Sequence, residues 1–345
     1  MFIDHGYEQC PKEPCVYRKY SDRGVAIFAI WVDDNFITGD DAEEIARMIE
    51  TLGKIFDIKI LGRLTFALGI RFEWRNDGVH MSQTAYAERV ASRFHLDEAR
   101  PTSVPMQKGF RPSSFNEEES TNEEIPYREA IGSLLYLALC TRPDISYAVC
   151  TMARYSNNHS CEHWTVVKNI IRYVQMTKGK GVLFSKENRS DDSINGYADS
   201  SYNDSDTGRS TNGYIIFLHG NPVLWRSQLT KSPAQSTMEA EIIAIHHVLQ
   251  EIKWITYVLS FLEKMEKRKV RILCDNNAAI QSVKDHRVTD RNKHIRPKYF
   301  GIVDQVKKGV ISIDKVSSEE QLADIFTKAI ANPQFSNLRD LIKVR

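Results

Sequence analysis

The sequence predicts an α/β (α+β) protein with several separate layers. Three observations support this class. Short β-type runs end at turn signals or acidic residues, segments with helical period lie between them, and residues 127 to about 178 have helical periodicity throughout. Such an order predicts sheets covered by helices rather than an all-helical or all-β fold.

The first region, residues 1–108, mixes strands and helices. "VAIFAIWV" and "NFITGD" predict a hairpin whose turn holds Asp33 and Asp34. "DAEEIARMIETLGKIF" predicts an amphipathic helix with an acidic first turn. "FALGIRFEWRNDGVHMSQ" predicts two strands about an Asn-Asp-Gly turn, and "QTAYAERVASRFHL" predicts a second helix.

Two polar, aperiodic segments divide the rest of the chain. Residues 110–126 are acidic and predict a linker, and "SKENRSDDS" predicts a second break. Between them, "PYREAIGSLLYLALC", "RPDISYAVCTMARYSNN" and "EHWTVVKNIIRYVQMTKG" predict helices. We therefore expect three domains, at residues 1–108, 109–188 and 189–345.

The third region begins with strands and continues as α/β. "INGYADSSY", "TNGYIIFLHG" and "PVLWRSQ" predict three strands, and a long helix follows from Ser236 to about residue 264. A strand "VRILCD", a helix "NAAIQSVK", a helix after Pro297, a strand "GVISIDKV" and a last helix from Glu319 complete it. This order predicts a mixed sheet with flanking helices.

Carboxylates stand at informative places in this third region. Asp199 falls in the first strand and Asp275 ends the strand "VRILCD", and ligand sites in α/β sheets form at strand ends. Asp324 falls inside the predicted last helix. Each has a simpler reading alone: Asp199 in an Asx turn, Asp275 as a helix N-cap, Asp324 as a solvated helix residue.

The phase of the long helix distinguishes its two glutamates. Glu241 begins an apolar stripe with helical spacing, formed by Ile245, Val248, Ile252 and Leu259. Glu239 lies about 200° away around the helix, so we expect it to face solvent. Glu241 could extend from the helix end into water. If it is buried instead, it needs a partner, and a divalent cation shared with Asp199 and Asp275 would supply one.

Composition sets wide limits on function. The 345 residues are 42% apolar and 26% charged, as in ordinary globular proteins, and the net charge of +1 excludes a strongly basic protein but not nucleic-acid binding. Six cysteines lack zinc-site spacing, which predicts free thiols in a reducing compartment. No run has the length of a signal peptide or membrane helix, so we expect a soluble intracellular protein.

Several motifs together resemble the C-terminal part of the Pol polyprotein of Ty1/copia-type LTR retrotransposons. "GYADSSYNDSDTGRSTNGYIIFLHG", "QSTMEAEIIAI", "ILCDNNAAI", "RNKHIRPKYFGI" and "EEQLADIFTKAI" resemble successive parts of its ribonuclease H domain. "PYREAIGSLLYLALCTRPDISYAV" resembles the segment between polymerase and ribonuclease H, and "IWVDDNFITGD" resembles the reverse-transcriptase box with two aspartates. The resemblance covers nearly the whole chain.

This resemblance implies a reverse-transcriptase palm remnant, a helical thumb or connection segment, and an RNase H-like domain. It implies that Asp199, Glu241, Asp275 and Asp324 are catalytic metal ligands for two Mg²⁺ ions, with Mn²⁺ as a possible substitute, and that an RNA–DNA hybrid is the substrate. Further partners would be the other Pol parts of an intact element, including protease, integrase and the rest of the reverse transcriptase. The compartment would be the cytoplasm, within virus-like particles, or the nucleus.

Asp33 and Asp34 are by resemblance two of three polymerase metal ligands, with Trp31 where the family usually has tyrosine. The third ligand belongs to an earlier strand, and Asp4 does not lie in a buried-strand pattern. Because one adjacent pair cannot hold two Mg²⁺ ions, we expect an incomplete polymerase that is inactive in this chain alone.

Two questions stay open at the level of sequence. Retroviral ribonucleases H have a histidine in a loop before the last aspartate, and "DKVSSEEQLAD" has none; His294 lies about thirty residues upstream, with a structural role as its simpler reading. The main rival to an active nuclease is a catalytically inactive, nucleic-acid-binding relic. A proofreading exonuclease would need Asp-x-Glu on the first strand, and a transposase would need glutamate in place of Asp324.

Overall fold

The computed structural model describes residues 1–112, 125–187, 193–263, 268–285 and 296–345. The chain forms two compact units, Met1–Ala67 with Glu251–Arg268, and Leu68–Gln250 with Lys269–Arg345. These limits differ from the three predicted domains, which remain predictions. In the described residues, no helix has the length and apolar character needed to cross a membrane. All six cysteines are free thiols, as predicted.

The first unit contains a four-stranded antiparallel sheet and a helix. The predicted hairpin is present, because β3 pairs with β4 and Trp31 lies opposite Asp34. The predicted helix is α1 (Ala42–Gly53), and the Asp41 side chain caps it by accepting a hydrogen bond from the Glu44 backbone N–H at 3.0 Å. The remaining elements are η1 (Ile3–His5), β1 (Glu8–Cys10), β2 (Glu13–Ser21), β3 (Gly24–Trp31), β4 (Asp34–Gly39) and β5 (Phe66–Ala67).

The core of the first unit is small and partly aromatic. The Phe2 ring stacks on the Tyr17 ring with their centroids 4.7 Å apart. Phe28 in β3 and Met48 in α1 are almost fully buried in the same cluster. A core of this size gives limited hydrophobic stabilisation, since stability rises with the apolar area removed from water.

The second unit begins with a short antiparallel sheet and a group of helices. Strands β6 (Ile70–Trp74) and β7 (Gly78–Ser82) are the two predicted about the Asn-Asp-Gly turn, and α2 (Thr84–Arg93) is the predicted helix. An unpredicted strand, β8 (Gly181–Ser185), pairs with β7. The predicted helical segment contains α3 (Tyr127–Cys140), η2 (Pro143–Ile145), α4 (Ser146–Ala153) and α5 (Cys161–Met176).

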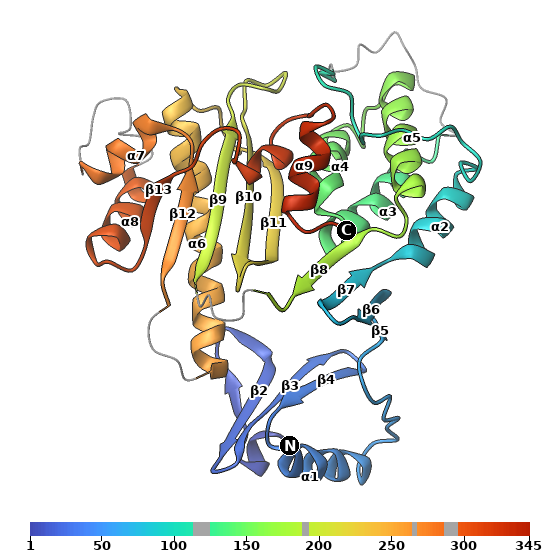
Figure 1. The fold of residues 1–345 in the computed structure, drawn as a ribbon, viewed down its shortest axis with the longest axis vertical. Helices are drawn as coiled ribbons and strands as arrows, with labels where there is room; N and C mark the ends of the chain where they lie inside the picture. The colour runs from blue at the N-terminus through green and yellow to red at the C-terminus, as the bar shows by residue number, and fades with distance from the viewer. Residues whose placement is uncertain (113–124, 188–192, 264–267, 286–295) are drawn as a thin grey trace. The chain divides into compact units, whose positions relative to one another are not determined.

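A five-stranded mixed sheet forms the rest of the second unit, in the order β11-β10-β9-β12-β13 (Figure 1). Strands β9, β10 and β11 are antiparallel neighbours, whereas β12 pairs parallel with both β9 and β13. This arrangement confirms the predicted RNase H-like domain with a mixed sheet. Its elements are β9 (Ile194–Ser201), β10 (Thr211–Leu218), β11 (Asn221–Leu229), α6 (Thr237–Glu263), β12 (Val270–Cys274), α7 (Asn277–Lys284), α8 (Arg296–Lys307), β13 (Ser312–Lys315), η4 (Leu322–Phe326) and α9 (Gln334–Leu341).

The prediction of a last helix from Glu319 is wrong in both the start and the type of the helix. Residues Leu322–Phe326 form a short 3-10 helix, η4, and the α-helix that follows, α9, begins only at Gln334. The Gln321 side chain caps η4 and also donates from Nε2 to the Ala198 carbonyl in β9 at 2.9 Å. Side-chain bonds to the sheet therefore hold this turn in place, where a regular helix was expected.

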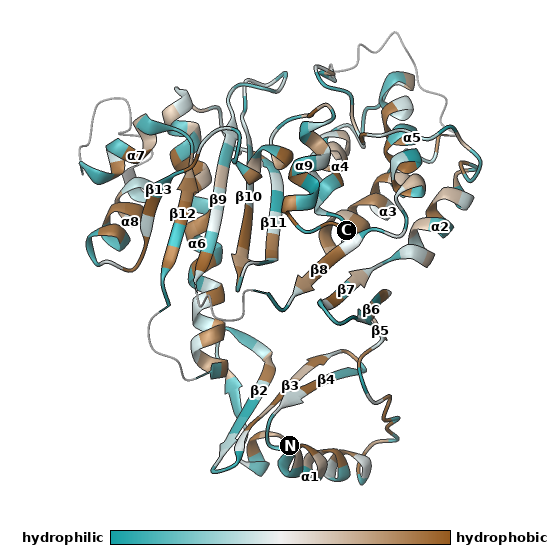
Figure 2. Ribbon diagram, in the orientation of Figure 1, coloured by the Kyte–Doolittle hydropathy of each residue, from teal (hydrophilic) through white to brown (hydrophobic). Residues whose placement is uncertain are grey.

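One hydrophobic core joins the helical segment to the mixed sheet. It contains residues of α3, α4 and α5 together with Ile215 and Phe217 of β10 and Phe326 of η4. In Figure 2 the ribbons of α3 and β10 are partly brown, the colour of hydrophobic residues. The Trp225 indole N–H of β11 also donates to the Ala138 carbonyl of α3 at 2.8 Å. The helices and the sheet thus share buried surface.

A fully buried ion pair lies at the centre of the helical segment. The Arg142 guanidinium donates two hydrogen bonds to the Asp144 carboxylate, at 2.9 and 2.8 Å, and both side chains are almost completely buried. The Tyr173 hydroxyl donates to Asp144 at 2.7 Å, and Arg142 also donates to the Thr177 hydroxyl at 2.7 Å. Burial opposes ionisation, but Arg142 outweighs it and lowers the pKa of Asp144.

We predict that Asp144→Asn lowers the free energy of unfolding by about 3–5 kcal/mol, because it leaves the Arg142 charge buried without its counter-ion. Denaturant unfolding of wild type and variant measures this difference. The matched control is Glu88→Gln, which removes the half-exposed pair with Lys178 at 2.8 Å and should cost less than about 1 kcal/mol. Equal costs for the two variants would contradict a special role for the buried pair.

Candidate active site

Two neighbouring strands, β9 and β12, and the helix α6 bring predicted site residues to the carboxyl ends of these strands. Asp199 lies near the end of β9 and is 6% exposed. Asp275 directly follows β12, the parallel neighbour of β9. Glu241 lies in the second turn of α6 and is also 6% exposed. The Asp275 side chain does not cap α7, since Asn276 does so by accepting from the Ala279 N–H at 3.0 Å.

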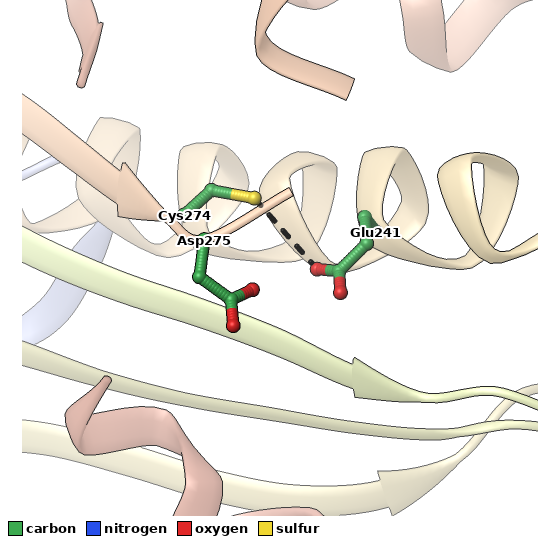
Figure 3. A group of neighbouring side chains, drawn as sticks. All are labelled: Glu241, Cys274 and Asp275. Carbon is green, nitrogen blue, oxygen red and sulfur yellow. Dashed lines mark hydrogen bonds between the residues drawn. The ribbon is translucent and has the colours of Figure 1, made fainter. Parts of the chain in front are cut away.

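Glu241, Cys274 and Asp275 form a group of potential metal ligands. One ligand atom from each side chain lies within 4.8 Å of the others. Figure 3 shows the Cys274 thiol directed from the end of β12 toward the Glu241 carboxylate, with 3.8 Å between Sγ and Oε2. The Asp275 carboxylate accepts a hydrogen bond from the Ser318 hydroxyl at 2.9 Å. Sequence reasoning missed Cys274, although it is adjacent to Asp275.

The η4 turn adds Asp324 and two neighbouring polar groups to the site. Asp324 is 4% exposed, and its Oδ2 atom lies 2.8 Å from the Lys328 ammonium. The Thr327 hydroxyl, which is fully buried, donates a hydrogen bond to the Asp199 carboxylate. Thr327 and Lys328 were not predicted, yet both lie in "ADIFTK", three and four residues after Asp324.

Asp199, Glu241 and Asp324 each have a raised pKa. Burial raises the pKa of Glu241 well above its usual value, and the charges of Asp199 and Asp275 raise it further. Burial also raises the pKa of Asp199, against the lowering effects of Lys328 and Thr327. Burial and the nearby Asp199 raise the pKa of Asp324 to about 7. Like charges that influence one another in this way identify a cluster of mutually repelling acids.

The donor set fits a hard divalent cation. Glu241 and Asp275 offer carboxylate oxygens, which Mg²⁺ and Mn²⁺ prefer, whereas Asp199 and Asp324 lie outside the group whose ligand atoms are within 4.8 Å of one another. In the described residues, the buried Oδ1 atom of Asp324 has no hydrogen-bond partner. An unpaired buried carboxylate oxygen is costly, and a cation bound there would remove both that cost and the repulsion between the acids.

The prediction that Glu239 faces solvent is wrong. Glu239 is 4% exposed, and its carboxylate accepts a hydrogen bond from the Gln235 backbone N–H at 2.9 Å. Residues 239–245 of α6 are all buried, so this end of the helix is covered on every side. Helical phase therefore directs Glu241 toward the other acids, but it does not expose Glu239.

Asp33 and Asp34 do not lie in a buried environment such as that of Glu241. Both are exposed at the β3–β4 turn of the first unit, after Val32 with φ of 53°. In the residues that the structure describes, neither Asp33 nor Asp34 belongs to a group of three potential metal ligands like that of Glu241, Cys274 and Asp275. His294 lies outside the described residues, so its role stays untested.

Comparisons with known proteins agree with the reverse-transcriptase resemblance. Residues 1–108 match the family described as reverse transcriptase (RNA-dependent DNA polymerase). The chain is 34% identical over 97% of its length to the retrovirus-related Pol polyprotein from transposon TNT 1-94 of Nicotiana tabacum, and 32% identical over 93% to that from transposon RE2 of Arabidopsis thaliana. The chain belongs to the copia-type transposon Pol polyprotein family.

This copia-type Pol chain spans about a quarter of its curated relatives, 26% of the tobacco polyprotein and 22% of the Arabidopsis one. Among solved structures, LC11 ribonuclease H1 in complex with an RNA/DNA hybrid is 16% identical, with a TM-score of 0.31 over 39% of this chain and 93% of that one. The strand order and pairing, rather than this score, establish the RNase H-like sheet of the Pol chain.

We predict that Gly213→Ala displaces η4. Gly213 lies opposite Asp199 in the β9–β10 ladder, and a Cβ atom there would lie 2.6 Å from Thr327 Cγ2 and 2.7 Å from Phe326 Cβ. We expect a loss of about 1–3 kcal/mol in the free energy of unfolding, measured with denaturant. The control is Gly132→Ala in α3, where a Cβ meets nothing within 4 Å. A loss no larger than the control's would contradict the close approach.

We also predict a pH dependence from His247 of α6. Its Nδ1 atom accepts from the Gln228 amide at 2.9 Å, and burial lowers the pKa of the ring to about 4. The unfolded chain binds this proton near pH 6.5 and the folded chain only near pH 4, so stability falls as pH falls between these values, by up to about 3 kcal/mol. Unfolding of wild type and His247→Gln across this range measures the effect, and the same pH dependence in both proteins would contradict it.

Proposed function

We propose that the RNase H-like part of this chain hydrolyses the RNA strand of RNA–DNA hybrids with a divalent cation. The observation that carries the proposal is that Asp199, Glu241 and Asp275 lie at the carboxyl ends of β9 and β12, and that Thr327, which ends the η4 turn containing Asp324, donates a hydrogen bond to Asp199. Burial of unpaired acids costs free energy of folding. A divalent cation bound among clustered acids would offset this cost and could also bind a phosphate group of the substrate. The family context supports a nucleic-acid substrate.

In this proposal the four carboxylates are the ligands, and each is held by a separate feature of the fold. Bound Mg²⁺ or Mn²⁺, in a pair as in two-metal nucleases, would activate water and stabilise charge on the leaving oxygen. The Thr327 hydroxyl fixes the orientation of Asp199, and the Ser318 hydroxyl does so for Asp275. The 2′-hydroxyl groups of the RNA strand and the shape of the hybrid would identify the substrate.

The domain assignment is part of the same proposal. Residues 1–108 would be the reverse-transcriptase palm part, residues 109–188 the linker and thumb or connection, and residues 189–345 the nuclease domain. The reverse-transcriptase match over residues 1–108 supports the first of these limits. The core shared by α3, α4, α5 and β10 supports a nuclease domain that is stabilised by the helical segment.

We predict Mg²⁺-dependent cleavage of a labelled RNA–DNA hybrid by the purified chain, and loss of cleavage below detection in Asp199→Asn and in Asp275→Asn. Each variant removes one charged ligand while keeping the size of the side chain. Cleavage is measured on a denaturing gel, with duplex DNA and duplex RNA of the same sequence for comparison. The control is Asp304→Asn, a half-exposed helix carboxylate paired with Lys308, which should cleave like the wild type.

Two outcomes would overturn this function. Cleavage that survives in both site variants would place the chemistry elsewhere. Folded wild-type protein that binds the hybrid without cutting it, with Mg²⁺ or Mn²⁺ present, would favour the inactive, nucleic-acid-binding relic.

A further inference from the structure

Lys328 places a positive charge directly on the carboxylate cluster. Its ammonium lies 2.8 Å from Asp324 Oδ2, four residues earlier in the chain, and Asp324 is buried while Lys328 is half-exposed. Burial would lower the pKa of Lys328, but the charges of Asp199 and Asp324 outweigh it and raise that pKa. The ammonium thus interacts with more than its nearest partner.

This ion pair differs from an ordinary surface pair. Asp304 in α8 and Lys308, the residue after this helix, have the same i, i+4 spacing and the same 2.8 Å distance, but both side chains are at least half-exposed. Such a pair contributes little to stability. Asp324, in contrast, belongs to a cluster of buried like charges, where removing the neighbouring cation leaves repulsion uncompensated.

The position of Lys328 allows its ammonium to leave. Half of the side chain is accessible to solvent, and the residue also lines a small hollow with Pro105, Tyr147 and Phe335. The carboxylate of Asp144, which lines the same hollow, is already held by Arg142 and Tyr173. The long lysine side chain therefore has space outside the cluster, where its charge is solvated.

We propose that Lys328 is an exchangeable counter-ion of the carboxylate cluster, which neutralises Asp324 in the metal-free protein and is displaced when a divalent cation binds. The inference rests on the proposed function, because it assumes that these acids are the cation's ligands. A cation on the Oδ1 atom of Asp324, which is unpartnered among the described residues, would share one carboxylate with the Lys328 ammonium on Oδ2, and two positive charges on the same carboxylate repel each other. Metal binding must then work against the ion pair.

A binding measurement tests this competition with Mn²⁺ alone as the probe. We expect Lys328→Met to bind Mn²⁺ roughly three- to tenfold more tightly than wild type by titration calorimetry, since it removes the competing charge and keeps most of the aliphatic stem. Lys328→Arg keeps the charge and should bind like the wild type. The matched control Lys308→Met should leave the affinity unchanged.

A second measurement uses the wild-type protein and does not depend on a variant that folds. Mild acetylation followed by mass spectrometry should modify Lys328 faster when Mn²⁺ is added, because its ammonium is released from Asp324, whereas Lys308 should react at the same rate with and without Mn²⁺. Unchanged Mn²⁺ affinity in Lys328→Met, or Lys328 labelling that does not increase, overturns the exchange. Wild-type protein that binds no Mn²⁺ contradicts the proposed function itself, and the inference with it.

Discussion

The repulsion between buried carboxylates is the constraint on which the C-terminal part of this molecule depends. Asp199, Glu241 and Asp324 are each at most 6% exposed, and their pKa values are raised by burial and by one another. A fold that brings such groups together gives up stability, so the surrounding structure must hold them there. Hydrogen bonds from Thr327 and Ser318 and the charge of Lys328 provide this support.

The support extends well beyond the site. Gly213 leaves space for η4 to approach β10, and the Gln321 amide fixes the start of η4 to the Ala198 carbonyl of β9. The helices α3, α4 and α5 share a hydrophobic core with the sheet. The Arg142–Asp144 pair, together with Tyr173 and Thr177, connects η2 to α5. The helical segment therefore stabilises the mixed sheet through their shared core.

The first unit gives a different electrostatic picture. Asp33 and Asp34 are adjacent but exposed, so water solvates both charges and no buried counter-ion is required. Aspartates that lie close together therefore repel each other strongly in the second unit, where they are buried, and weakly in the first, where they are exposed. Burial, rather than proximity alone, is what makes a bound cation necessary. Membership of the copia-type Pol family explains why both motifs occur in one chain.

The sequence by itself determined most of the element order, though not β8 or the last helix. It also determined the hairpin at Asp33 and Asp34, the mixed α/β layer and the strand-end positions of Asp199 and Asp275. These follow from local patterns of period, turn residues and strand termination, which neighbouring residues suffice to encode. It also selected Glu241 through helical phase. Only the tertiary structure decided that Glu239 is buried and that η4 is a 3-10 turn. Only the tertiary structure places Cys274, Thr327 and Lys328 beside the carboxylates of the site. The positions of all these residues depend on contacts between segments far apart in the chain.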